Sequence, residues 1–158
     1  MKDWPLFKLF LAGAGGFTAI FFLAALTCWK GTPLLMAPFG ASCVLLFSVP
    51  NSPLSQPINV IGGHLVSSFI GVTFALFLYP SPWVLAISVG IAISAMALLN
   101  VTHPPAGADP IVILLGYKGF SFLLFPVLFG SVFLVLVACL YHRFFGTAQY
   151  PISLKNPN

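Results

Sequence analysis

The sequence predicts an all-α integral membrane protein, and three observations lead to this fold class. Of its 158 residues, 59% are hydrophobic and only 5% are charged, whereas roughly a quarter of a soluble domain is charged. The mean hydropathy is +1.07. The apolar residues also form runs separated by turns rich in Pro and Gly, and several runs are long enough to cross a hydrocarbon core of about 30 Å.

Four of these runs have the length of full transmembrane helices. They cover residues 9–28, 59–79, 83–101 and 120–141. Pro126 lies inside the last run and predicts a kink there, because proline removes a backbone donor and clashes with the preceding turn. The remaining apolar segments are shorter and interrupted, so we expect two short helices that are broken or re-entrant.

The first interrupted segment covers residues 34–49 and contains Pro38 and Gly40. The second follows the stretch 100–110, which holds three prolines, His103 and one of only two acidic residues. Three prolines so close together exclude a continuous helix, whereas proline suits the first helical position. We therefore predict that one helix ends near Asn100 and that another begins at Pro104 or Pro105.

The two interrupted segments share a pattern of Pro, any residue, Gly, Ala and Ser or Asp. It reads Pro38-Phe39-Gly40-Ala41-Ser42 and, 67 positions later, Pro105-Ala106-Gly107-Ala108-Asp109. We predict a single membrane domain, 1–158, with internal repeats at about 5–79 and 83–145. The alternative is chance similarity of a few residues. The repeat is inverted if the short helices cross the membrane and parallel if they re-enter, and the sequence leaves both open.

The few basic residues predict the topology. Lys2, Lys8, Arg143 and Lys155 fall on one side of the membrane and Lys30 and Lys118 on the other. This bias favours cytoplasmic termini, and we expect a multi-pass protein of the bacterial inner (plasma) membrane. Six basic residues in all give no support for nucleic-acid binding.

The paired interrupted segments predict a binding site. Such segments at matching positions mark the sites of many transporters, and a helix that begins inside a protein offers unpaired N–H groups to an anion. We expect the segments to face each other in the interior. The candidate substrate-binding residues are Pro38, Phe39, Gly40, Ala41, Ser42, His64, His103, Pro104, Pro105, Ala106, Gly107 and Ala108. The alternative is two proline kinks that shape helix packing and bind nothing.

Three titratable residues have further interpretations. His103 and Asp109 form a possible proton relay, since ionisable groups in membrane segments are usually functional; Asp109 has the alternative of stabilising its own helix N-terminus. His64 lies beside small residues at Gly63, Ser67 and Gly71 that predict an inward face, or it simply bonds a carbonyl at a helix contact. His142 is expected at the interface, beside Arg143.

The sequence does not predict an enzyme. It contains no nucleophile–base spacing, phosphate loop or paired carboxylates. No cofactor and no metal site are expected, because the His, Asp and Cys residues lack ligand spacing. Cys28, Cys43 and Cys139 are expected to be free thiols.

Several motifs resemble those of the HPP family of small integral membrane proteins. They are Ala37–Ser42, Ser52-Pro53, Gln56-Pro57, Asn59–His64 and His103–Ala108, in the order in which the family has them. The resemblance implies four transmembrane helices, which agrees with the four long runs. Some members, in cyanobacteria and plant plastids, are known as nitrite transporters, so the resemblance implies nitrite as the substrate.

Together these observations predict that the protein works as a homo-oligomer in the lipid bilayer and transports a small inorganic anion, and the resemblance implies that this anion is nitrite. One alternative is a structural or assembly subunit whose stripe at Gly63, Ser67 and Gly71 packs on partner helices. The other is a channel or transporter for another small solute.

Overall fold

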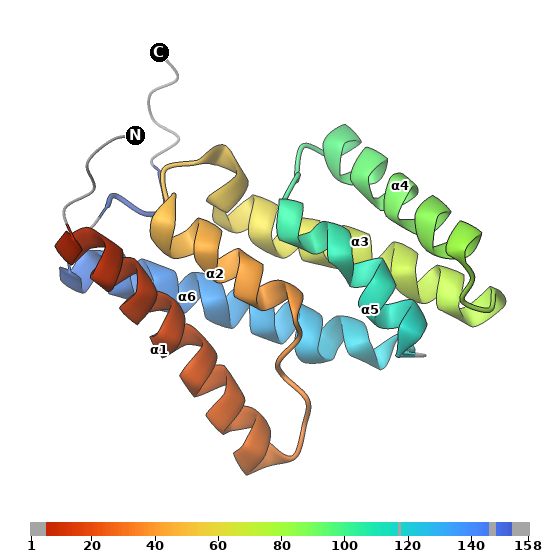
Figure 1. Ribbon diagram of the computed structural model, residues 1–158, viewed down its shortest axis with the longest axis horizontal. Coiled ribbons are helices and arrows are strands. Elements are labelled where there is room, and N and C mark those ends of the chain that lie inside the picture. Colours follow the sequence, from red (N-terminus) through yellow and green to blue (C-terminus); the bar gives the residue numbers. More distant parts are fainter. Residues whose placement is uncertain (1–5, 117, 146–147, 153–158) are drawn as a thin grey trace.

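The computed structural model describes residues 6–116, 118–145 and 148–152, and every regular element within these ranges is a helix (Figure 1). In chain order these are α1 (Leu6–Lys30), α2 (Pro38–Ser48), η1 (Pro53–Ser55), α3 (Pro57–Phe77), α4 (Pro82–Leu98), η2 (Pro104–Ala108), α5 (Asp109–Leu115), η3 (Leu123–Leu128) and α6 (Phe129–Phe145). The predicted all-α fold class is therefore confirmed.

Three helical stretches are long and apolar enough to cross a membrane: α1, α3 and η3 continued by α6. The helix α4 has 17 residues and belongs with the shorter apolar helices, as do α2 and the segment formed by η2 and α5. It is shorter than the predicted run because it ends at Leu98, after which Asn100 adopts a positive φ of 56°. A left-handed residue cannot continue a right-handed helix.

Several helices begin at or next to a proline. It occupies the first turn of α2, α3, α4 and η2, where a missing N–H costs no helical hydrogen bond. The predicted start at Pro104 is confirmed. The predicted kink is also present, since Phe125, just before Pro126, has non-helical dihedral angles.

The segment η2–α5 runs beside α3 and in the same direction. Ser67 on α3 donates to the Ala106 carbonyl at 2.6 Å, and Asn59 donates to the Thr102 carbonyl at 3.0 Å. A Cβ added at Gly71 would meet Pro110 at 2.8 Å. The small residues of α3 therefore face inward, as predicted, and allow close packing within this chain.

The helix α2 likewise runs beside α6 and in the same direction. A Cβ added at Gly130 would meet the Phe39 ring, and the Leu46 carbonyl lies 2.8 Å from His142 Nε2. His142 is only 2% exposed. The helix α6 thus turns this side chain toward the end of α2, and the position of His142 at the membrane interface stays a prediction.

Two hydrogen bonds bring the starts of α1 and α3 to the end of the bundle where α6 ends. Tyr141 Oη donates to the Leu11 carbonyl at 2.6 Å, and Tyr150 Oη donates to the Ser55 carbonyl at 2.9 Å. The starts of α1 and α3 therefore lie beside the end of α6, and both helices run opposite to α6. Lys8 and Arg143 lie at this end, as the charge bias predicted; Lys2 and Lys155 lie outside the described residues.

The two halves of the chain therefore run in opposite senses. In the first half α1 and α3 run in one direction and α2 runs in the other. In the second half η2–α5 runs in the direction of α1 and α3, whereas α4 and α6 run in the direction of α2. Figure 1 shows α1 and α2 at one end of the antiparallel pair α3 and α6, with α4 and α5 at the other. This is the order of directions that an inverted repeat has.

Two close backbone approaches are related by the same offset as the motifs. A Cβ on Gly63 would lie 2.8 Å from the Val101 carbonyl oxygen, and a Cβ on Gly130 would lie 3.1 Å from the Leu34 carbonyl oxygen. Gly130 lies 67 positions after Gly63, and Leu34 lies 67 positions before Val101. These contacts agree with the repeat boundaries, which stay a prediction.

Candidate functional site

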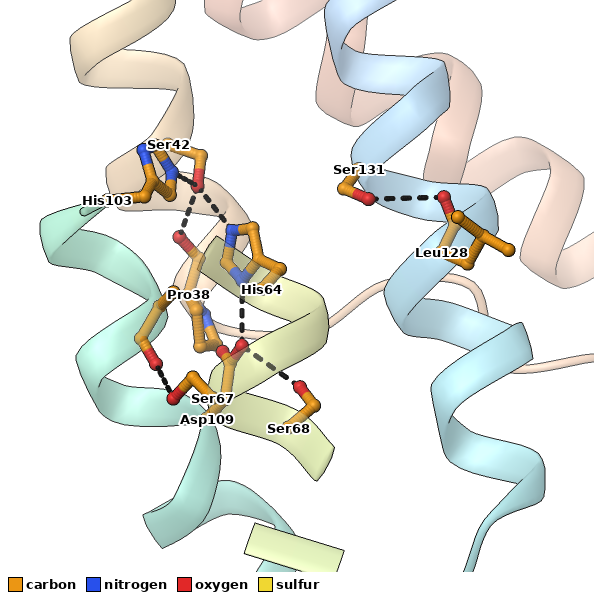
Figure 2. A network of polar contacts seen from close by, with 10 residues as sticks. Pro38, Ser42, His64, Ser67, Ser68, His103, Asp109, Leu128 and Ser131 are labelled. Carbon is orange, nitrogen blue, oxygen red and sulfur yellow. Dashed lines mark hydrogen bonds and ion pairs between the residues drawn. The ribbon is translucent and has the colours of Figure 1, made fainter. Parts of the chain in front are cut away.

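A buried hydroxyl joins the two interrupted segments. Ser42 Oγ lies 2.9 Å from His64 Nε2 and 2.9 Å from His103 Nε2 (Figure 2). Ser42 belongs to α2, His64 to α3, and His103 immediately precedes η2. The prediction that the interrupted segments face each other is therefore confirmed.

The contacts continue beyond both imidazole rings. His64 Nδ1 lies 2.8 Å from Asp109 Oδ2, and His103 Nδ1 lies 2.8 Å from the Leu54 carbonyl oxygen. We call Ser42, His64, His103 and Asp109 the polar chain. All four side chains are fully buried. A buried polar group without a partner is costly, so this set of contacts specifies how α2, α3 and η2–α5 meet.

Asp109 is the inner end of the polar chain. Ser68 Oγ donates to its Oδ2 at 3.0 Å, whereas its Oδ1 is buried and has no hydrogen-bond partner among the described residues. Ser68 is the twelfth of the 21 residues of α3, which places it about 17 Å along that helix. The chain thus reaches from Leu54, beside the start of α3, to the middle of the span.

Neighbouring groups hold the polar chain in position. The Phe39 ring meets the His64 ring edge to face with centroids 5.2 Å apart, and the centroids of the two imidazoles are 5.0 Å apart. The bond from Ser67 to the Ala106 carbonyl fastens η2 to α3 next to them. Packing of this kind limits the rotation of both rings.

The predicted site residues divide into two groups. The buried ones are Pro38, Phe39, Ser42, His64, His103, Pro105, Ala106 and Asp109. Gly40, Ala41, Pro104 and Ala108 are exposed on the outer faces of their segments, and Gly107 is half-buried. The structure brings together only part of the predicted set, and a role in substrate binding stays a prediction for every member.

The backbone amides at the starts of the short helices are already engaged. The N–H of Gly40 donates to the Ala37 carbonyl at 3.1 Å, and the N–H of Ala106 donates to the His103 carbonyl at 3.0 Å. An anion held by these amides, as the sequence suggested, would have to displace the turns.

Two members of the site could not be assigned from the sequence. The Leu54 carbonyl is a backbone group in a Pro-rich loop, and no residue type marks it. Ser68 belongs to no motif, and the one sequence signal that could have found it is its spacing of four residues from His64, which places both on one face of α3.

The interior has no fixed positive charge within the described residues. Lys8, Lys30, Lys118 and Arg143 are all exposed. The described ranges also contain no group of three His, Cys, Asp or Glu side chains that could share a metal ion. Among the side chains that the structure describes, only a protonated imidazole can therefore place positive charge near Asp109.

Comparisons with known proteins agree with a membrane protein. A family model described as the HPP transmembrane region matches residues 1–151. Two curated Dictyostelium discoideum proteins, both named only as transmembrane proteins, are 33% identical to the chain over 127 and 134 residues. The alignments cover 75% and 80% of this chain, but 45% and 43% of the relatives, so the chain spans less than half their length. No solved structure matches.

Proposed function

The chain belongs to the HPP transmembrane family, and on this premise we propose that it transports a small inorganic anion. The observation that carries the proposal is the polar chain, which links both interrupted segments inside the bundle through Ser42. Buried ionisable side chains are expensive in a membrane span and usually mark a transport pathway. A purely structural bundle has no need of two imidazoles and a carboxylate at its centre.

The charges of the site define which solute fits. An anion next to Asp109 is repelled unless protons neutralise the carboxylate or charge an imidazole. Both imidazoles lie within the polar chain. Once Ser42 is displaced, His64 can donate one hydrogen bond to a small oxyanion, and His103 can donate a second when it is protonated, because its Nδ1 hydrogen faces the Leu54 carbonyl. A small anion that enters together with protons therefore suits this interior better than a cation or a large organic solute.

Nitrite is the substrate that we propose first. It rests on the resemblance of the motifs around His103 and His64 to those of nitrite-transporting members of the family. Nitrite has two oxygens that can each accept a hydrogen bond, which matches two imidazole donors.

The same proposal includes the membrane arrangement. The helix α4, with 17 residues, is the fourth span, since spans of about 17 residues occur. The protein resides in a bacterial inner membrane, works as a homo-oligomer, and has both termini in the cytoplasm.

The test is exchange of labelled nitrite for unlabelled nitrite in liposomes that contain the purified protein. Alkaline buffer on both sides keeps nearly all nitrite ionised and limits leakage of the neutral acid, and protein-free liposomes measure the rest. We expect saturable exchange by the wild type and at least tenfold slower exchange by His103→Ala. Unchanged exchange by His103→Ala would remove that residue from the site. Nitrate, chloride and formate as competitors would rank the substrates.

In the alternative of an assembly subunit, the small-residue stripe of α3 would contact partner helices. Gly63, Ser67 and Gly71 face His103, Ala106 and Pro110 of the same chain, so this stripe is not available to a partner helix. An assembly role would have to use another face, and it predicts no exchange of any anion. A channel for another solute predicts flux that does not saturate and that nitrite does not inhibit.

A further inference from the structure

The hydrogen bonds of the polar chain require a definite number of hydrogens. Four contacts run in series: Leu54 carbonyl to His103, His103 to Ser42, Ser42 to His64, and His64 to Asp109. Each contact needs one hydrogen between its two heavy atoms. A carbonyl only accepts, so His103 Nδ1 carries a hydrogen.

The side chains themselves supply only three of these hydrogens. Two neutral imidazoles and one hydroxyl contribute one each, and an ionised carboxylate contributes none. If Ser42 donates to His103, then His64 must donate to Ser42 through Nε2, which leaves a bare Nδ1 facing Asp109 Oδ2 at 2.8 Å. If Ser42 donates to His64 instead, then His64 Nδ1 can donate to Asp109, but His103 Nε2 is bare and faces Ser42 Oγ at 2.9 Å. Two acceptors at that distance repel each other. The observed arrangement therefore contains at least one additional proton.

The alternative orientation of Ser42 does not remove this requirement. Its hydroxyl can instead point to the Pro38 carbonyl at 3.3 Å. Both imidazoles must then donate to Ser42 Oγ, and the number of hydrogens required rises by one. The contact with Asp109 is unchanged in this case.

From this count we propose that the contact between His64 Nδ1 and Asp109 Oδ2 is a proton-binding site that couples anion transport to one proton. This rests on the proposed function. With the proton present, the pair is neutral whether imidazolium faces carboxylate or imidazole faces carboxylic acid. When the proton leaves, three hydrogens remain for four contacts, so one contact opens and α3 loses one of its hydrogen bonds to α5 or to α2.

The position and surroundings of Asp109 agree with this role. It lies beside the middle of α3, and its second oxygen has no partner among the described residues, so it can accept a proton without breaking a bond. Apart from the polar chain, the titratable side chains on helices that pack against α3 are Cys43 on α2 and Cys139, Tyr141, His142 and Arg143 on α6. No hydrogen bond joins any of them to the polar chain within the described residues, and α4 carries no titratable residue.

The first experiment compares wild type with Asp109→Asn in nitrite-exchanging liposomes. An asparagine amide can donate to His64 Nδ1 and imitates the proton-loaded pair permanently. We expect Asp109→Asn to exchange nitrite at a rate that, unlike that of the wild type, no longer depends on pH. We expect its net uptake driven by an acidic exterior, after subtraction of protein-free liposomes, to fall at least tenfold. Net uptake at the wild-type rate, or loss of exchange in a monodisperse protein of unchanged thermal stability, would overturn the proton site.

The second experiment needs no variant. One nitrite together with one proton carries no net charge, so we expect net uptake by the wild type to be insensitive to a membrane potential set with potassium and valinomycin. A bare anion would change its equilibrium accumulation roughly tenfold for every 60 mV, and that response would overturn the coupling. Absence of wild-type exchange would instead refute the proposed function, and this inference with it.

Discussion

Ser42 and Asp109 contact opposite nitrogens of one imidazole ring. Ser42 Oγ lies 2.9 Å from His64 Nε2, and Asp109 Oδ2 lies 2.8 Å from His64 Nδ1. These two residues occupy the same place in the two matching motifs, 67 positions apart. The two interrupted segments thus meet at one side chain of α3, and movement of either segment must change the surroundings of His64.

Replacement of Ser42 should destabilise the bundle. Ser42→Ala removes the hydroxyl between both Nε2 atoms and leaves them buried without that partner, which costs about 1–3 kcal/mol. Thermal unfolding in detergent measures this. The matched control is Ser131→Ala, because Ser131 is also buried but bonds only the Leu128 carbonyl of its own helical segment at 3.1 Å (Figure 2). An equal loss in both variants would contradict a special role for Ser42.

Gly63 should not tolerate a methyl group. In Gly63→Ala the new Cβ would lie 2.7 Å from His103 Cβ and 2.8 Å from the Val101 carbonyl oxygen, and such overpacking costs about 1–3 kcal/mol. Gly90→Ala in α4 is the control, since a Cβ there meets nothing within 4 Å. That change should be neutral or stabilise by about 0.5–1 kcal/mol. Chemical unfolding of both variants in the same detergent compares them, and a Gly63→Ala protein as stable as Gly90→Ala would show that the packing is looser than described.

Tyr150 should hold the loop that carries Leu54. Its hydroxyl donates to the Ser55 carbonyl at 2.9 Å. Burial raises the pKa of the Tyr150 phenol, so it stays protonated and keeps donating as the pH rises through the physiological range. Tyr150→Phe should lose about 1 kcal/mol and speed amide exchange in η1. Tyr79→Phe is the control, because Tyr79 is 85% exposed, and equal exchange in η1 for both variants would argue against this anchor.

Cysteine labelling tests the topology. In a background with Cys28, Cys43 and Cys139 changed to alanine, Lys30→Cys and Gln149→Cys each place one exposed thiol at opposite ends of the bundle. If the termini are cytoplasmic, an impermeant maleimide added to intact cells should label Lys30→Cys and should label Gln149→Cys only after lysis. The reversed pattern would reverse the orientation, and with it the side from which Leu54 is approached.

The sequence predicted the helices and the meeting of the interrupted segments because both depend on local residue types. Apolar runs determined which stretches are helical, and proline determined where α2 and η2 begin. The burial of His142 was not predicted, because it depends on where α6 meets the end of α2, and that packing leaves no local signal. Likewise, the exposure of Gly40 and Ala41 depends on how α2 is rotated about its axis, which a pattern of five residues does not specify.

The pairing of His64 with Asp109 was also beyond the sequence. The two residues are 45 positions apart, and the sequence offered a simpler partner for Asp109 in its own helix. Only the close packing at Gly63 and Gly71 brings η2–α5 near enough to α3 for the carboxylate to reach the imidazole. The sequence therefore identified the four side chains that meet in the polar chain but not their order in it.

The most direct test of the central claim, that the polar chain carries a small anion through the bundle, is labelled nitrite exchange by three proteins in matched liposomes. They are the wild type, Ser42→Ala and Ser131→Ala, each reconstituted at equal density and checked for a monodisperse state. We predict saturable exchange by the wild type and by Ser131→Ala, and at least a tenfold slower rate for Ser42→Ala. Exchange by Ser42→Ala at the wild-type rate would contradict the account, as would wild-type exchange no faster than that of protein-free liposomes.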